Sequence, residues 1–134
     1  MVKSQLVIHS VSVWRHPNIR TWQPANPEQI TEIVTISIGH RSTKGSDLFT
    51  IRVATPAGLS TLNAEDGILA IRPLLIMDKY DFQNLWNWLE KTVTKCDKGD
   101  WNACVHQLRL YFDWEYEGYK EGGLRNRTEA AKKP

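Results

Sequence analysis

The chain has 134 residues, of which 41% are hydrophobic and 24% are charged. This is the size and composition of one globular domain, and it excludes a disordered chain or a small fold that depends on disulfides or a metal. The longest apolar run, residues 68–77, contains Arg72 and Pro73 and has about half of the ~20 residues that a membrane-spanning helix requires. The first apolar run, residues 6–8, is broken at once by His9, unlike a secretory signal. We therefore expect a cytoplasmic protein that makes no use of a membrane.

The modest positive charge of the chain, +2 at pH 7, is concentrated near its C-terminus. From residue 120 onward there are five basic and two acidic residues, so this end carries +3 and residues 1–119 carry −1. We predict one domain over residues 1–121 and a disordered basic tail over residues 122–134. The body gives no indication of a direct nucleic-acid surface, although the tail could contact RNA or another acidic surface.

The two cysteines, Cys96 and Cys104, do not form a C-x-x-C pair, and no histidine stands beside them at zinc-ligand spacing. In a cytoplasmic protein such cysteines are free thiols. We expect them to serve as small core residues.

The N-terminal half of the sequence has the patterns of β-strands. Residues 5–14 are rich in Val and Ile, and residues 34–38 (VTISI) and 49–54 (FTIRVA) alternate apolar with mostly polar side chains. A polar turn at residues 39–45 joins the last two, which predicts an antiparallel hairpin with one solvated face. Residues 68–77 suggest a fourth, mostly buried strand, with Pro73 at an edge or a bulge.

Two helices are predicted in the C-terminal half. Asp81 and Asp100 are the expected N-caps, because each carboxylate can accept a hydrogen bond from the first helical turn. Pro56 can open a further short helix near residues 57–63. The expected inner faces are Phe82, Leu85, Trp86, Leu89 and Val93 in the first helix, and Trp101, Cys104, Val105, Leu108 and Tyr111 or Phe112 in the second. The short loop between the helices predicts roughly antiparallel neighbours.

This order of elements, strands first and helices last, favours an α+β fold. We predict a single antiparallel sheet of about four strands with the two C-terminal helices packed on one face.

The sequence contains no recognisable catalytic or cofactor motif. Phosphate-binding glycine loops, H-E-x-x-H and G-x-S-x-G are all absent. The four histidines are scattered, although His9 and His40 could meet in space as the acid and base of a small hydrolase or nuclease. We predict no catalytic residue, no cofactor and no metal site.

The residues after the second helix form the first candidate binding site. Asp113, Glu115 and Glu117 alternate with aromatic residues, Tyr116 among them, so an extended backbone would place the acids on one face and the aromatics on the other. Aromatic residues are frequent at binding hot spots, and acids attract a basic partner. The alternative is an edge strand that buries its aromatics and solvates its acids.

Trp88 is the second candidate for binding. It follows Trp86 by two residues, so its side chain should point away from the core face of the helix. An exposed tryptophan indicates either a partner or a covering loop from the same chain. The predicted partner-binding set is therefore Trp88, Asp113, Glu115, Tyr116 and Glu117.

An ordered set of motifs over residues 30–119 resembles the Immunity protein 8 family of bacterial polymorphic-toxin and contact-dependent growth inhibition systems. The set comprises GSDLFTIRVATP at residues 45–56, LLIMDKYD at residues 74–81, Asp100-Trp101, and WEYE at residues 114–117. The resemblance implies a non-enzymatic cytoplasmic antitoxin that binds the C-terminal toxin domain encoded by the neighbouring gene. It also implies that Thr55-Pro56 and Tyr80-Asp81 are turn and cap residues, and it supplies no list of toxin contacts.

The resulting hypothesis is an immunity protein that occludes the active site of a toxin, in particular a nuclease with a basic cleft. A small hydrolase or nuclease that uses His9 or His40, and an RNA-associated protein that acts through its basic tail, remain the alternatives.

Overall fold

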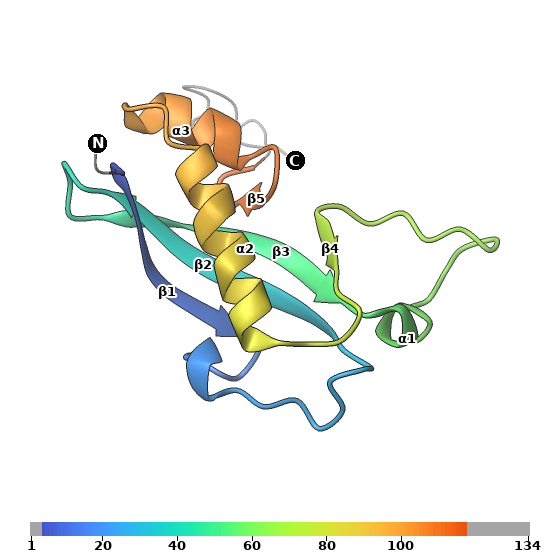
Figure 1. Ribbon diagram of the computed structural model, residues 1–134. Helices are drawn as coiled ribbons and strands as arrows, with labels where there is room; N and C mark the ends of the chain where they lie inside the picture. Colours follow the sequence, from blue (N-terminus) through green and yellow to red (C-terminus); the bar gives the residue numbers. More distant parts are fainter. Residues whose placement is uncertain (1–3, 118–134) are drawn as a thin grey trace.

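Three long strands and one long helix dominate the architecture (Figure 1). The computed structural model describes residues 4–117, so the predicted tail lies outside the described residues. The elements follow one another as β1 (Leu6–Val13), η1 (Ile19–Thr21), β2 (Thr31–His40), β3 (Ser46–Ala54), α1 (Pro56–Leu59), β4 (Leu74–Ile76), α2 (Phe82–Lys95), α3 (Trp101–Leu108) and β5 (Asp113–Trp114). The α+β prediction is confirmed.

The sheet is built around the predicted hairpin. β1, β2 and β3 are joined by antiparallel pairing, and the register places Val34 opposite Ile51 and Ile36 opposite Phe49. The other edge of β3 pairs with two short strands, first β5 near Phe49 and then β4 near Val53. β4 runs parallel to β3, a detail that the alternation pattern did not predict.

The predicted buried strand at residues 68–77 is wrong in extent and burial. Only Leu74–Ile76 is a strand, and the side chain of Ile76 is 54% exposed. The apolar run has the composition of a core strand, but the edge of β3 accepts only three of its residues as β4. The rest belongs to a long connection.

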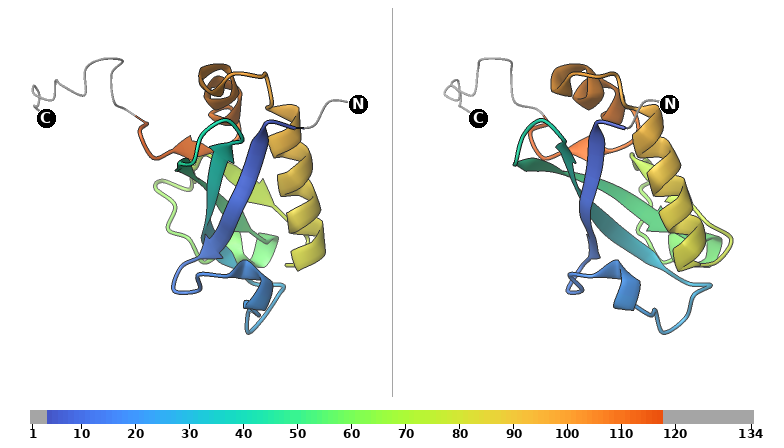
Figure 2. Two further views of the ribbon diagram at one scale, coloured as in Figure 1. Left: turned by 90° about the vertical axis from the view of Figure 1, so that its left-hand side faces the viewer. Right: turned by 60° about the vertical axis from the view of Figure 1, so that its left-hand side comes forward.

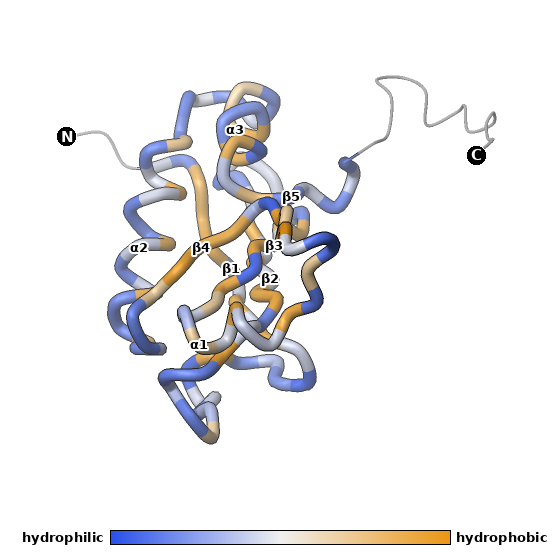
Figure 3. The backbone as a smooth tube through the Cα atoms, turned by 90° about the vertical axis from the view of Figure 1, so that its right-hand side faces the viewer, coloured by the Kyte–Doolittle hydropathy of each residue, from blue (hydrophilic) through white to orange (hydrophobic). Residues whose placement is uncertain are grey.

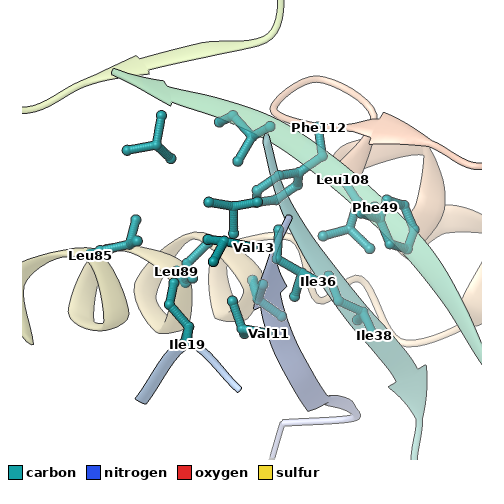
Figure 4. Packing of buried hydrophobic residues seen from close by; sticks show 14 of the residues in the cluster. Val11, Val13, Ile19, Ile36, Ile38, Phe49, Leu85, Leu89, Leu108 and Phe112 are labelled. Atoms are coloured by element: carbon teal, nitrogen blue, oxygen red, sulfur yellow. The ribbon is translucent and has the colours of Figure 1, made fainter. Parts of the chain in front are cut away.

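Helix α2 covers one face of the sheet. The Asp81 carboxylate accepts a hydrogen bond from the Asn84 amide at 3.0 Å, as an N-cap does. Leu85, Leu89 and Val93 are buried. Figure 4 shows Leu85 and Leu89 on the side of the helix that faces the inward side chains of the strands. Phe82 and Trp86, also predicted for this face, are only partly buried and pack against the core at its margin.

Helix α3 closes one end of the core. The Asp100 carboxylate caps it at the Ala103 amide, 3.3 Å away, and Cys104, Val105 and Leu108 are buried. Phe112, just past the helix, packs edge-on against Phe49. α3 lies across the C-terminal end of α2 at a steep inclination (Figures 1 and 2), so the antiparallel pair predicted from the short loop is wrong.

The Thr55-Pro56 motif has the structural role predicted for it. The Thr55 hydroxyl accepts hydrogen bonds from the Ile30 and Gly58 amides and donates one to the Glu28 carbonyl at 2.8 Å, and the residue is fully buried. Pro56 then begins α1, where a missing amide costs nothing. α1 is thereby fastened to the segment that enters β2.

This close packing predicts that Gly58→Ala destabilises the fold. A Cβ at Gly58 would meet the Ile30 carbonyl oxygen at 1.7 Å, so the backbone must shift, whereas a Cβ at Gly45 meets nothing within 4 Å. We expect urea denaturation to show a loss of about 2–3 kcal/mol in the free energy of unfolding for Gly58→Ala, the upper range for overpacking. Gly45→Ala is the matched control and should change it by less than about 0.5 kcal/mol. Equal effects at the two glycines would contradict this packing.

Candidate partner-binding surface

The face of the sheet opposite α2 and α3 carries no helix (Figure 2). Because side chains alternate along a strand, the residues between the buried positions point to this side. The register aligns Ser12 with Thr35, Thr35 with Thr50, and Thr50 with Asp113, which makes a polar row across four strands. We define the open face as Ser10, Ser12, Ile33, Thr35, Ser37, Leu48, Thr50, Arg52, Leu74 and Ile76. Of these, Ser37 is buried, and its hydroxyl is hydrogen-bonded to that of Ser46 at 2.6 Å.

The open face is poor in charge. Its centre carries hydroxyl groups. Among the residues of this set only Arg52 is charged, and it donates a hydrogen bond to the Thr31 hydroxyl at 2.8 Å. The carboxylate of Asp113 lies at the β5 end of the polar row. Toward its margins Ile33, Leu48 and Ile76 are 40%, 43% and 54% exposed. Depletion of charge at the centre of a patch distinguishes protein–protein interfaces from ordinary surface.

A long connection, residues 60–73, extends beyond the edge formed by β4 (Figures 1 and 3). Asp66 and Gly67 both have positive φ, and Glu65 and Ile68 exchange two backbone hydrogen bonds of 2.9 Å around them. This is the geometry of a tight two-residue hairpin turn, for which Asp-Gly is a favoured sequence. The turn presents Ile68 at 67% exposure, so this connection adds apolar surface beside the sheet.

The predicted acidic and aromatic segment is extended only over its first residues. Asp113 lies in β5 opposite Thr50, on the side of the open face. Glu115 stays at the edge of β3, where its amide donates to the Leu48 carbonyl and its carboxylate accepts from the Leu48 amide at 2.7 Å. The Glu117 amide then donates to the Trp114 carbonyl, so the chain turns and the alternation ends.

The prediction of one continuous acidic row is therefore wrong. Asp113 and Glu115 border the open face, whereas Glu117 is held on the helix side by the Arg109 guanidinium through two hydrogen bonds of 2.8 Å. This hydrogen-bonded ion pair, together with the charge of Arg72, lowers the pKa of Glu117. Tyr116, 40% exposed, lies beside the Trp114 ring, with 5.2 Å between the ring centroids.

The expectation that Trp88 points away from the core is also wrong. Its ring meets the buried Phe112 edge-on at 6.0 Å, and it packs against the core cluster. The segment after α3 thus covers the tryptophan, which was the alternative considered from the sequence. Trp88 lies on the helix side of the sheet and is separated from Asp113 and Glu115 by the sheet itself.

The two histidines of the hydrolase alternative lie on opposite faces of the sheet. A Cβ at Gly39 would come within 2.7 Å of His9 Nε2, so the His9 ring covers this glycine on the open side. His40 is buried on the other side, where its Nε2 is 2.5 Å from the Gly99 carbonyl oxygen and its Nδ1 is 2.6 Å from the Ser42 hydroxyl. They cannot act as an acid and base pair in this arrangement.

The metal-ligating side chains and the two thiols were the other groups considered in the sequence. No cluster of three metal-ligating side chains occurs among residues 4–117. Within the same part of the chain, no helix is long and apolar enough to cross a membrane. Cys96 and Cys104 are buried free thiols as predicted, and burial raises the pKa of Cys96 to about 11, which disfavours a reactive thiolate.

Sequence reasoning missed the residues that make up most of this surface. Thr35 and Ser37 form the polar half of the β2 alternation, which by itself predicts only a solvated face. The apolar context of Ile76 predicts a core position, whereas its side chain is 54% exposed. The length of β4 depends on pairing with β3, a contact that local sequence does not specify.

The Arg109–Glu117 pair predicts a specific dependence of stability on pH. The pKa of Glu117 is lower in the folded chain than its ordinary value of 4.5, so its carboxylate stabilises the fold above that pH. The effect is lost as pH falls through the lowered pKa. Because the pair is partly exposed, we expect the free energy of unfolding of wild type to exceed that of Glu117→Gln by no more than about 1 kcal/mol at pH 7, and this difference to shrink as pH falls below 4.5. Chemical denaturation of both proteins at several pH values measures this difference in the free energy of unfolding. A difference that does not change with pH would contradict the role of this ion pair.

A protein-family model for Immunity protein 8 matches residues 6–119. The match begins well before residue 30, so it takes in β1 as well as the motifs identified in the sequence. No curated protein and no solved structure matches the chain. Since the matched region includes every strand of the described sheet and helices α2 and α3, this chain belongs to the Immunity protein 8 family.

Proposed function

We propose that this chain is a cytoplasmic immunity protein that neutralises the C-terminal toxin domain encoded beside it by binding and occluding the toxin. Membership of the family supports the antitoxin role. The single structural observation that supports the mechanism is the open face, a helix-free side of the sheet whose centre is uncharged. The protein acts through the shape of this surface and catalyses no reaction.

The open face has suitable properties for a rigid docking surface. Its backbone is fixed by the pairing of β1, β2 and β3, so little conformational entropy is lost when a partner binds. The exposed side chains of Ile33, Leu48 and Ile76 supply apolar contacts around the hydroxyl centre. The connection at residues 60–73 enlarges the surface toward the ~800 Å² per partner that stable complexes bury.

The charges at one border indicate which part of a toxin would face this surface. Asp113 and Glu115 lie together at the β5 edge of the open face. An enzyme that acts on nucleic acid has a basic surface around its substrate cleft. We therefore propose that the toxin is a nuclease and that the open face covers the entrance to its cleft, with these two acids opposite its basic residues.

Thr35→Arg tests the proposed interface. Thr35 lies at the centre of the open face, between Ser12 and Thr50, so an arginine there places a long charged side chain where the partner must approach. We expect its affinity for the toxin domain to fall at least 100-fold, about 2.8 kcal/mol, because the partner is held away and a charge is desolvated. Isothermal titration calorimetry with the toxin domain encoded immediately upstream measures this.

Thr94→Arg is the matched control, because Thr94 is exposed on α2 at the other side of the molecule. It should bind as wild type does, and both variants should keep a wild-type far-ultraviolet circular dichroism spectrum. Absence of any complex between the wild-type chain and the toxin at micromolar concentration would refute the proposed function. A complex that is weakened by Thr94→Arg and not by Thr35→Arg would refute the proposed interface alone.

A further inference from the structure

A second feature lies at the C-terminal end of the described chain, on the helix side of β5. A hollow of about 330 Å³ opens there, which we name the basic hollow. It is lined by Arg72, His106, Arg109, Leu110 and Glu117. These residues come from the long connection, from α3 and its end, and from the segment after β5.

One guanidinium in the basic hollow is held in a fixed position. Arg109 donates from Nε and from one terminal nitrogen to the two oxygens of Glu117, each at 2.8 Å. Its guanidinium carbon also lies 5.5 Å from the centre of the Trp114 ring. A paired and stacked arginine loses little side-chain freedom when a partner binds beside it.

The second guanidinium, that of Arg72, is exposed and forms no salt bridge with any residue between 4 and 117. Its charge nevertheless reaches Glu117, because it contributes to the lowered pKa of that carboxyl. One carboxylate therefore shares the hollow with two guanidinium groups, and the exposed His106 lines the same hollow. The hollow keeps an excess of positive charge after its internal ion pair has formed.

We propose that the basic hollow receives a carboxylate side chain of the toxin, an Asp or a Glu that pairs with Arg72. This proposal rests on the proposed function and specifies a second contact of the same complex. Leu110, 67% exposed at the edge of the hollow, packs against the apolar part of the same toxin segment. An apolar contact beside a charged pair excludes water from the pair and strengthens it.

A protein carboxylate fits the basic hollow better than a nucleic acid does. Binding to a phosphate backbone requires several basic groups spaced along a strand. Here one of the two arginines is already paired with Glu117, and Leu110 occupies the rim. The available charge suits a single additional carboxylate.

This contact makes the charge pattern of the interface alternate in sign. Asp113 and Glu115 border the open face and favour basic toxin residues, whereas the basic hollow, beyond β5, favours an acidic one. Opposite signs at neighbouring positions discriminate against a toxin whose charges are arranged differently. The basic hollow would thereby contribute to recognition of one cognate toxin.

Substitution of Arg72 tests this proposal. The variants are Arg72→Gln, which removes the charge, and Arg72→Glu, which reverses it. The controls are Lys44→Gln and Lys44→Glu, which make the same charge changes at an exposed position in the turn between β2 and β3. We expect the Kd for the upstream-encoded toxin domain to rise about 10-fold for Arg72→Gln and about 100-fold for Arg72→Glu, and less than 3-fold for either control.

A charge reversal on the toxin identifies the partner group. Each surface Asp or Glu of the toxin is changed to Lys, and one of these changes should restore at least 10-fold of the affinity that Arg72→Glu loses. If the Arg72→Glu variant fails to fold, Arg72→Gln and its control decide the question. Wild-type affinity in Arg72→Gln, or no restoring change on the toxin, would overturn the proposal.

Two further outcomes distinguish this proposal from failure of the proposed function and from a phosphate-binding role of the hollow. If the wild-type chain does not bind the toxin at all, the proposed function is refuted, and the contact at the basic hollow is refuted with it. If wild type binds a single-stranded RNA oligonucleotide and Arg72→Glu abolishes that binding, the hollow is a phosphate site and the carboxylate assignment is overturned. We expect no RNA binding that depends on Arg72.

Discussion

The structure depends on the two-residue period of β2. Val34, Ile36 and Ile38 are almost completely buried on the helix side of the sheet, while Thr35 and Ser37, which alternate with them along the strand, point to the other side. A shift of one residue in register would exchange these two sets and place three large aliphatic side chains in water. The same alternation therefore fixes the hydrophobic core and the chemistry of the open face, so stability and the proposed binding surface come from one pattern.

The second constraint is the edge of β3. A long exposed edge would present unpaired amides and carbonyls to other chains. Here β4 pairs with one end of this edge, and β5 pairs with residues nearer the other end. Beyond β5, the Glu115 carboxylate accepts a hydrogen bond from the Leu48 amide. By closing the edge, these segments bring the long connection and the residues after α3 to the same side of the molecule, where both the border of the open face and the basic hollow are formed.

The elements with strong local signals could be predicted from sequence. The β2–β3 hairpin, the caps at Asp81 and Asp100, and the helix-opening Thr55-Pro56 motif all rest on alternation or on hydrogen bonds within a few residues. The predictions that were wrong concern features that depend on contacts between residues far apart in the sequence. Trp88 is covered by Phe112, which lies 24 residues later, and β4 ends where its pairing with β3 ends. The predicted acidic row is not continuous because Glu117 forms an ion pair with Arg109. The alternation of residue types in the sequence does not reveal this pair.

The central claim is that the toxin contacts the open face, and methyl NMR of the complex tests it most directly. Ile33 and Ile76 are exposed on this face, whereas Ile19 and Val93 are buried on the helix side of the sheet and serve as internal references. We expect the methyl signals of Ile33 and Ile76 to shift or broaden when the unlabelled toxin domain is added, while those of Ile19 and Val93 stay in place. Shifts confined to the helix side, with Ile33 and Ile76 unchanged in a fully formed complex, would contradict the account.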